Sequence, residues 1–72
     1  MKPGIAEIID QADAEWQSET DQILMIAQGL QDGVDCILVK VKCDPSELAH
    51  IIPAAFMGYR VVVFQGPEDY AQ

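Results

Sequence analysis

Two cysteines and one histidine are the residues of this chain whose chemistry could go beyond charge. Cys43 stands just before a predicted helix start, where the helix dipole and unpaired backbone N–H groups would stabilise a thiolate. Asp44 beside it opposes that effect. His50 would lie about 10 Å further along the helix, at about 1.5 Å per residue, which is beyond hydrogen-bond reach of Cys43. We therefore predict a strand-end cysteine packed at a helix start, and we assign no catalytic residue.

The same residue types do not predict a metal site or a disulfide. Cys36 and Cys43 fall on one predicted strand, about 23 Å apart at about 3.3 Å per residue, so a disulfide between them is not expected. One histidine and two separated cysteines do not make a zinc site, and no glycine-rich phosphate loop is present. We therefore expect neither a metal nor a cofactor, and we expect that the protein is not an enzyme.

The acidic residues are the other candidate functional group. The net charge is −8. Residues 1–35 hold eight acidic side chains against Lys2 alone, whereas residues 36–72 hold four against three cations. Such a chain is unsuited to bind a phosphate backbone directly, but it can attract a basic protein surface. Solubility is the alternative reason for the charge. The acidic residues predicted to meet a partner are Glu7, Asp10, Asp13, Glu15, Glu19 and Asp21.

Two helices are predicted in the first half of the chain. Residues 4–17 place apolar side chains on one stripe from Ile5 to Trp16, with the acids opposite or on its flanks. Ser18 or Thr20 can cap a second helix over 21–32, and Gly33 is a typical residue at a helix end. On that second helix Ile23, Ile26, Ala27 and Leu30 would share one face.

Two strands and a third helix are predicted in the second half. Residues 35–43 are typical of a strand. Ile37, Val39 and Val41 point to one face, and Cys36, Leu38, Lys40 and Lys42 point to the other. Asp44, Pro45 and Glu47 mark a helix start. Pro53 should kink that helix, Gly58 should end it, and residues 60–64 form the second strand.

These elements predict a small α/β domain over residues 1–72, with a polar tail at 66–72. The order is α-α-β-α-β, and the two strands form a parallel β-α-β unit. The helices should cover one sheet face and leave the other open to a partner or a second copy, which allows a homodimer. The residues predicted for this open face are Leu38, Lys40, Lys42, Val61 and Val63.

No apolar run is long enough to span a membrane, and no apolar segment follows Lys2 as in a signal peptide. The sequence therefore predicts no membrane contact and a cytoplasmic location.

Residues 21–64 resemble the TusA/SirA-like sulfur-carrier fold, through Asp44-Pro45, Ile52-Pro53 and Gly58-Tyr59. That family carries its working cysteine in a Cys-Pro-x-Pro motif at the start of its first helix. Residues 18–21 stand at that place here and contain no cysteine. The resemblance therefore implies the fold without the activity, and it gives Cys36 and Cys43 no persulfide role.

In size and charge the chain is also similar to small acidic phage proteins, among them anti-CRISPR inhibitors and DNA mimics. From these features we predict a non-catalytic interaction module, an inhibitor or regulator whose acidic helix face binds a basic protein, for instance one that binds nucleic acids. The alternative is a degenerate TusA-like sulfur-carrier or accessory protein, with Cys43 as a minor thiol candidate.

Overall fold

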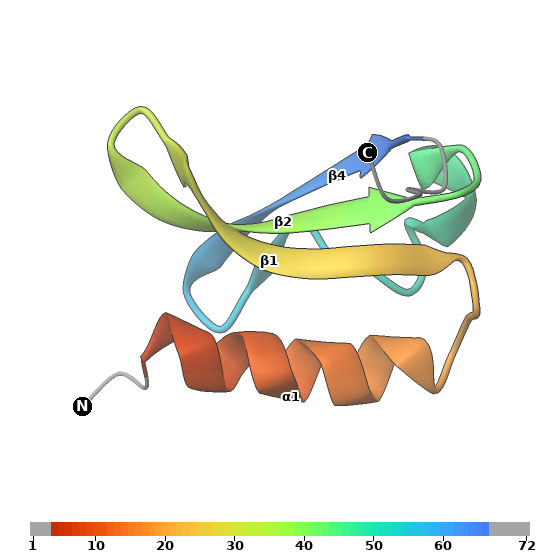
Figure 1. Ribbon diagram of the computed structural model, residues 1–72, viewed down its shortest axis with the longest axis horizontal. Helices are drawn as coiled ribbons and strands as arrows, with labels where there is room; N and C mark the ends of the chain where they lie inside the picture. The colour runs from red at the N-terminus through yellow and green to blue at the C-terminus, as the bar shows by residue number, and fades with distance from the viewer. Residues whose placement is uncertain (1–3, 67–72) are drawn as a thin grey trace, which may run out of the picture.

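The computed structural model describes residues 4–66, which form a small α+β domain (Figure 1). Within this range the chain has one α-helix and a four-stranded mixed sheet with the strand order β1-β2-β4-β3. The elements are α1 (Ile5–Gln17), β1 (Ile23–Gln31), β2 (Val34–Val41), the 3-10 helix η1 (Pro45–Leu48), β3 (Ala55–Phe56) and β4 (Tyr59–Gln65).

Helix α1 follows the prediction closely. Ile8, Ala12 and Trp16 are its buried residues, spaced four apart so that they form a stripe along one side. The side chain of Ser18 donates a hydrogen bond to the carbonyl of Glu15 at 2.7 Å, where the helix ends. The apolar stripe therefore fixes which side of the helix faces the sheet and which side faces solvent.

The predicted helix over 21–32 is wrong, because residues Ile23–Gln31 form strand β1. A bulge lies between Ile23 and Met25: Ile23 pairs with Val41, and Met25 pairs with Lys40. Leu24 is the extra residue. This bulge places Ile23 and Ile26 on the same face of the strand, although they are three positions apart and a regular strand would put them on opposite faces. The spacing that resembled a helical stripe therefore belongs to a bulged strand.

The turn after β1 explains why a strand forms there. Asp32 and Gly33 both have positive φ, at 54° and 78°. Two such residues between paired strands are typical of a type I′ hairpin turn, and Asp-Gly is a preferred sequence for it. Gly33 thus closes the antiparallel β1–β2 hairpin rather than ending a helix.

Strands β2 and β4 pair in parallel, as predicted, with Ile37 opposite Val61. Their connection is not the predicted helix. It contains η1, a run of turns and the two-residue strand β3, which pairs antiparallel with β4. Pro53 explains the difference, because proline removes a helical hydrogen bond and disfavours the helical conformation of the residue before it. The order α-α-β-α-β is therefore corrected to one helix and four strands within residues 4–66.

The start of the third predicted helix is correct even though its length is not. Asp44 caps η1, and its carboxylate accepts a hydrogen bond from the backbone N–H of Ser46 at 3.0 Å. Pro45 follows as the first residue. The sequence therefore correctly indicates a helix cap at Asp44, but the helix that follows is a 3-10 helix of only four residues.

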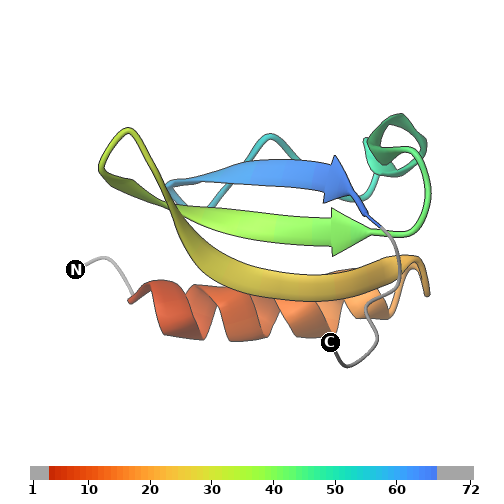
Figure 2. The ribbon, with the colours of Figure 1, turned by 45° about the horizontal axis from the view of Figure 1, so that its top comes forward.

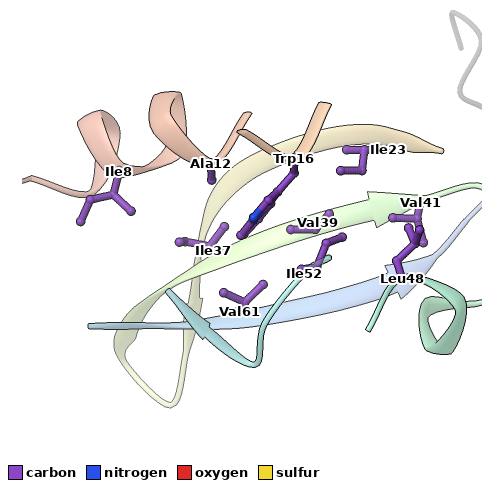
Figure 3. Packing of buried hydrophobic residues seen from close by; sticks show 10 residues of the cluster. All are labelled: Ile8, Ala12, Trp16, Ile23, Ile37, Val39, Val41, Leu48, Ile52 and Val61. Carbon is purple, nitrogen blue, oxygen red and sulfur yellow. The ribbon is translucent and has the colours of Figure 1, made fainter. Parts of the chain in front are cut away.

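One face of the sheet carries the core. Ile37, Val39 and Val41 are fully buried there, as predicted. Figure 3 shows the side chains of Ile8, Ala12 and Trp16 pointing from α1 toward this face. The connection before β4 also contributes buried side chains, Leu48 and Ile52, and Phe56 meets Trp16 edge to face with 5.1 Å between ring centroids. We call this side the covered face.

Helix α1 packs against β1 and runs along it (Figures 1 and 2), while Leu48 and Ile52 of the connection complete the core. The opposite face of the sheet carries no helix within residues 4–66 (Figure 2). No helix of that same range has the length and hydrophobicity needed to cross a membrane. Apart from Gly66, the predicted tail lies outside the described residues.

Candidate functional site

The exposed surface of α1 carries four carboxylates, which we call the acidic helix face: Glu7 and Asp10 lie opposite the buried stripe, and Asp13 and Glu15 lie on its flanks. Burial of Ile8, Ala12 and Trp16 on the other side holds them outward. Among residues 4–66 none of the four carboxylates has an ion pair or a hydrogen bond. Within residues 4–66 no cation neutralises their charge.

The two remaining predicted acids lie beyond the helix, in the segment that leads to β1. Glu19 is exposed, and its backbone N–H bonds to the carbonyl of Trp16 at 3.0 Å, which continues the helical end. Asp21 is also exposed and accepts a hydrogen bond from the side chain of Gln22 at 2.9 Å. Both extend the acidic surface from α1 toward the start of β1.

The open face of the sheet differs in part from its predicted composition. Leu38 and Lys40 lie on it, as predicted, because they alternate with the buried residues of β2. Val61 and Val63 do not. Val61 pairs with Ile37 and Val63 pairs with Val39, so both belong to the covered face. This corrects the prediction for the two valines.

The residues of β4 that do lie on the open face are Arg60, Val62 and Phe64. They pair with Cys36, Leu38 and Lys40 of β2. A shift of one residue in register exchanges the two faces of a strand. Because residues 61–63 are all valine, the sequence shows no alternation there that could indicate which of them face the core. Lys42 lies just after β2, exposed, with its backbone N–H bonded to Gln22.

The open face is apolar with cations beside the apolar residues. Met25 and Phe64 are 43% and 38% exposed. On β1, Met25 pairs with Lys40 and Ala27 with Leu38, which extends the apolar surface across three strands. Pairs of opposite residues share a sheet face. The molecule therefore carries carboxylates on helix α1, and it carries apolar side chains together with lysine and arginine on the open face of the sheet.

The cysteines are both free thiols, and neither is arranged as a nucleophile. Cys36 is buried and lines a shallow pocket of about 330 Å³ together with Arg60 and the residues of the hairpin tip. Cys43 packs half-buried against the core. It precedes only the four residues of η1, so the longer helix that could stabilise a thiolate is missing. His50 is exposed in the following turn.

A metal centre has no support in the described part of the chain. Residues 4–66 bring together no group of three or more histidine, cysteine or acidic side chains that could hold a metal ion. The acidic helix face does not change this, because its carboxylates point outward along the helix instead of converging on one point.

Sequence reasoning missed that β1 is an edge strand of the sheet within residues 4–66, because it predicted a helix there. Among the strands of residues 4–66, β1 is the outermost on its side of the sheet. It is nine residues long and contains no charged residue and no proline. The Asp32-Gly33 pair between two apolar segments was the signal that could have identified it.

Comparisons with protein-family models, with curated proteins and with solved structures found no match. The resemblances to TusA/SirA-like carriers and to small phage inhibitors therefore stay predictions.

Proposed function

We propose that this protein is a non-catalytic interaction module that inhibits or regulates a basic protein by binding it through the acidic helix face. The observation that carries the proposal is the set of four exposed carboxylates that surround the buried stripe of α1 and have no partner among residues 4–66. The partner is a protein and not a nucleic acid, because a chain with a net charge of −8 repels phosphates.

Clustered charge of one sign acts mainly on the rate of association. It steers a partner of opposite charge into contact and raises the association rate, and salt reduces the effect. A nucleic-acid-binding protein presents the kind of basic surface that such a face fits, as with anti-CRISPR inhibitors and DNA mimics. We place the interaction in the cytoplasm. The open sheet face would serve as a second contact, for the same partner or for a second copy in a homodimer.

The alternative, a degenerate sulfur carrier with Cys43 as its thiol, has less support. Residues 23–31, which correspond to a helix in the resemblance, form a strand. The helix that would follow Cys43 is a single short turn. Thiol labelling at neutral pH would revive this alternative if Cys43 reacted much faster than an ordinary cysteine.

The test compares two variants with equal changes of charge. Asp10→Asn with Asp13→Asn removes half of the acidic helix face. Asp32→Asn with Asp35→Asn removes two charges from the hairpin tip, and asparagine tolerates the positive φ of Asp32. Proteins captured from the native host at low and at high salt are quantified for the wild type and both variants.

At low salt we expect the wild type and the hairpin-tip variant to retain the same captured proteins. The helix-face variant should lose these proteins, and high salt should release them from the wild type and from the hairpin-tip variant. Equal retention by both variants, or retention that does not change with salt, would contradict the proposal.

A further inference from the structure

We propose that the free edge of β1 accepts an extended basic segment of the partner as an added strand, beside the acidic helix face. This inference rests on the proposed function and deepens it, because it states how the partner's chain is held. Strand addition to a sheet edge supplies main-chain hydrogen bonds, while side chains on the added strand supply specificity.

The two edges of the sheet differ in how they are protected. Proteins usually guard an edge strand with charged residues, proline or a very short strand. β3 has two residues, whereas β1 has nine, none of them charged and none of them proline. Leu30 on β1 is 71% exposed. β1 therefore has the properties of a strand that pairs with another chain.

The backbone of β1 presents outward-directed groups at a regular spacing. In a two-residue hairpin, the pair that flanks the turn exchanges hydrogen bonds, and bonded pairs then alternate along the strands. Here that pair is Gln31 and Val34. It follows that Ile26, Gln28 and Leu30 direct their N–H and C=O groups away from β2. Within residues 4–66 no turn, loop or cap hydrogen bond uses these groups.

The position of α1 favours a basic segment. The helix packs against β1 and runs along it (Figures 1 and 2), so an added strand would lie next to the helix. The helix carries four acidic residues and no lysine or arginine. The negative charge of this helix would attract basic side chains on the added strand, and Ile26 and Leu30 would offer apolar contacts.

A second copy of this chain fits the edge less well. Antiparallel pairing of β1 with its copy about a two-fold axis would put both α1 helices on the same side of the joined sheet. Neighbouring strands are about 4.8 Å apart, whereas packed helices need about 8–10 Å between axes. Helices packed on the two central strands would collide, and their like charges would repel. An extended segment without its own helix avoids both problems.

The experiment uses the whole chain, labelled with 15N, and a defined probe. The probe is a synthetic eight-residue peptide that alternates lysine and valine, with acetylated and amidated ends. The control peptide has the same sequence but carries N-methyl groups on its four central residues, which prevents pairing through either edge. Amide hydrogen exchange and chemical shifts are recorded with and without each peptide, at low and at high salt.

We expect the probe to slow exchange of the Ile26, Gln28 and Leu30 amides at least about tenfold, because these amides become bonded. The Met25, Ala27 and Gly29 amides, which already face β2, should change little. The methylated control should leave all six unchanged. The Gln28→Pro variant removes one outward N–H and should weaken probe binding about tenfold at both salt concentrations, which corresponds to about 1.4 kcal/mol.

The outcomes separate this inference from the proposed function. If the probe shifts resonances of Glu7, Asp10 and Asp13 without slowing the three outward amides, the acidic helix face binds but the strand-addition inference is overturned. If neither region responds and the capture experiment also fails, both are overturned. If the three amides are protected without peptide, in a way that depends on protein concentration, a second copy occupies the edge and the inference is wrong.

Discussion

The two faces of the sheet show how unevenly this small chain distributes its apolar residues. On the covered face Ile37, Val39 and Val61 pack under α1 and the connection before β4. On the open face Leu38, Val62 and Phe64 have no helix over them within residues 4–66. A parallel strand pair is usually covered on both sides. Stability should therefore depend mainly on the covered face, while the open face remains available for binding.

The largest expected effect is the loss of the central side chain of the covered face. Trp16→Ala removes a buried ring that meets Phe56 at 5.1 Å between centroids. We expect a loss of about 3–5 kcal/mol in the free energy of unfolding, measured by urea denaturation followed by circular dichroism. Phe64→Ala on the open face is the control and should cost less than about 1 kcal/mol. Comparable losses would show that the open face is buried in solution, for instance against a second copy.

A finer comparison uses two neighbouring valines that point to opposite faces. Val61 is 7% exposed on the covered face, and Val62 lies half-buried on the open face. Val61→Ala should lower the free energy of unfolding by about 1.5–3 kcal/mol, because it loses two buried methyl groups and leaves a cavity. Val62→Ala should cost about 0.5–1 kcal/mol. If the order of the two losses were reversed in urea denaturation, the register of β4 on β2 would be wrong.

The hairpin turn that sets the pairing of β1 with β2 should give an intermediate effect. Gly33 has φ of 78° with open space around its Cα, so Gly33→Ala tests backbone strain without a clash. We expect a loss of about 1–2 kcal/mol by thermal or urea unfolding. Gly4→Ala is the matched control, since Gly4 also has open space but a φ of −70°. Equal stability of both variants would argue against the positive φ at Gly33.

The smallest effect is expected away from both faces, at Asp44. Hydrogen bonds from the backbone and side chain of Ser46 hold the pKa of Asp44 below its usual value. A lowered folded-state pKa means that this contribution is present above the unfolded pKa and is lost as the pH falls through the folded pKa. Asp44→Ala should therefore be slightly less stable than the wild type at neutral pH.

That difference should shrink as the pH falls below about 4, the usual range for an aspartate. Thermal unfolding of both proteins across pH 2 to 7 checks this prediction. A stability difference that stayed constant with pH would mean that the carboxylate charge does not contribute to the cap.

The correct predictions and the errors have a common physical origin. Helix α1 was predictable because its stripe and its end are local features of 13 residues. Strand β1 was not predictable, because the bulge at Leu24 gives its apolar residues a spacing similar to that of a helix. Only the pairing of this segment with β2 distinguishes the strand from a helix. The helix after Asp44 was predicted from a genuine cap, but Pro53 and the positive φ values of Met57 and Gly58 turn the chain into the β3–β4 hairpin.

The features of the candidate site also separate into those that follow from local sequence and those that depend on strand pairing. The acidic helix face follows from composition and helical spacing. The sequence alone was enough to identify its carboxylates, the inward residues of β2 and the cap at Asp44. The fold was needed to show that β1 is an edge strand among those of residues 4–66, that Val62 and not Val61 faces outward, and that α1 lies beside that edge. These features depend on which strands pair and in what register, and pairing joins residues that are distant in the chain and leaves no local periodicity to read.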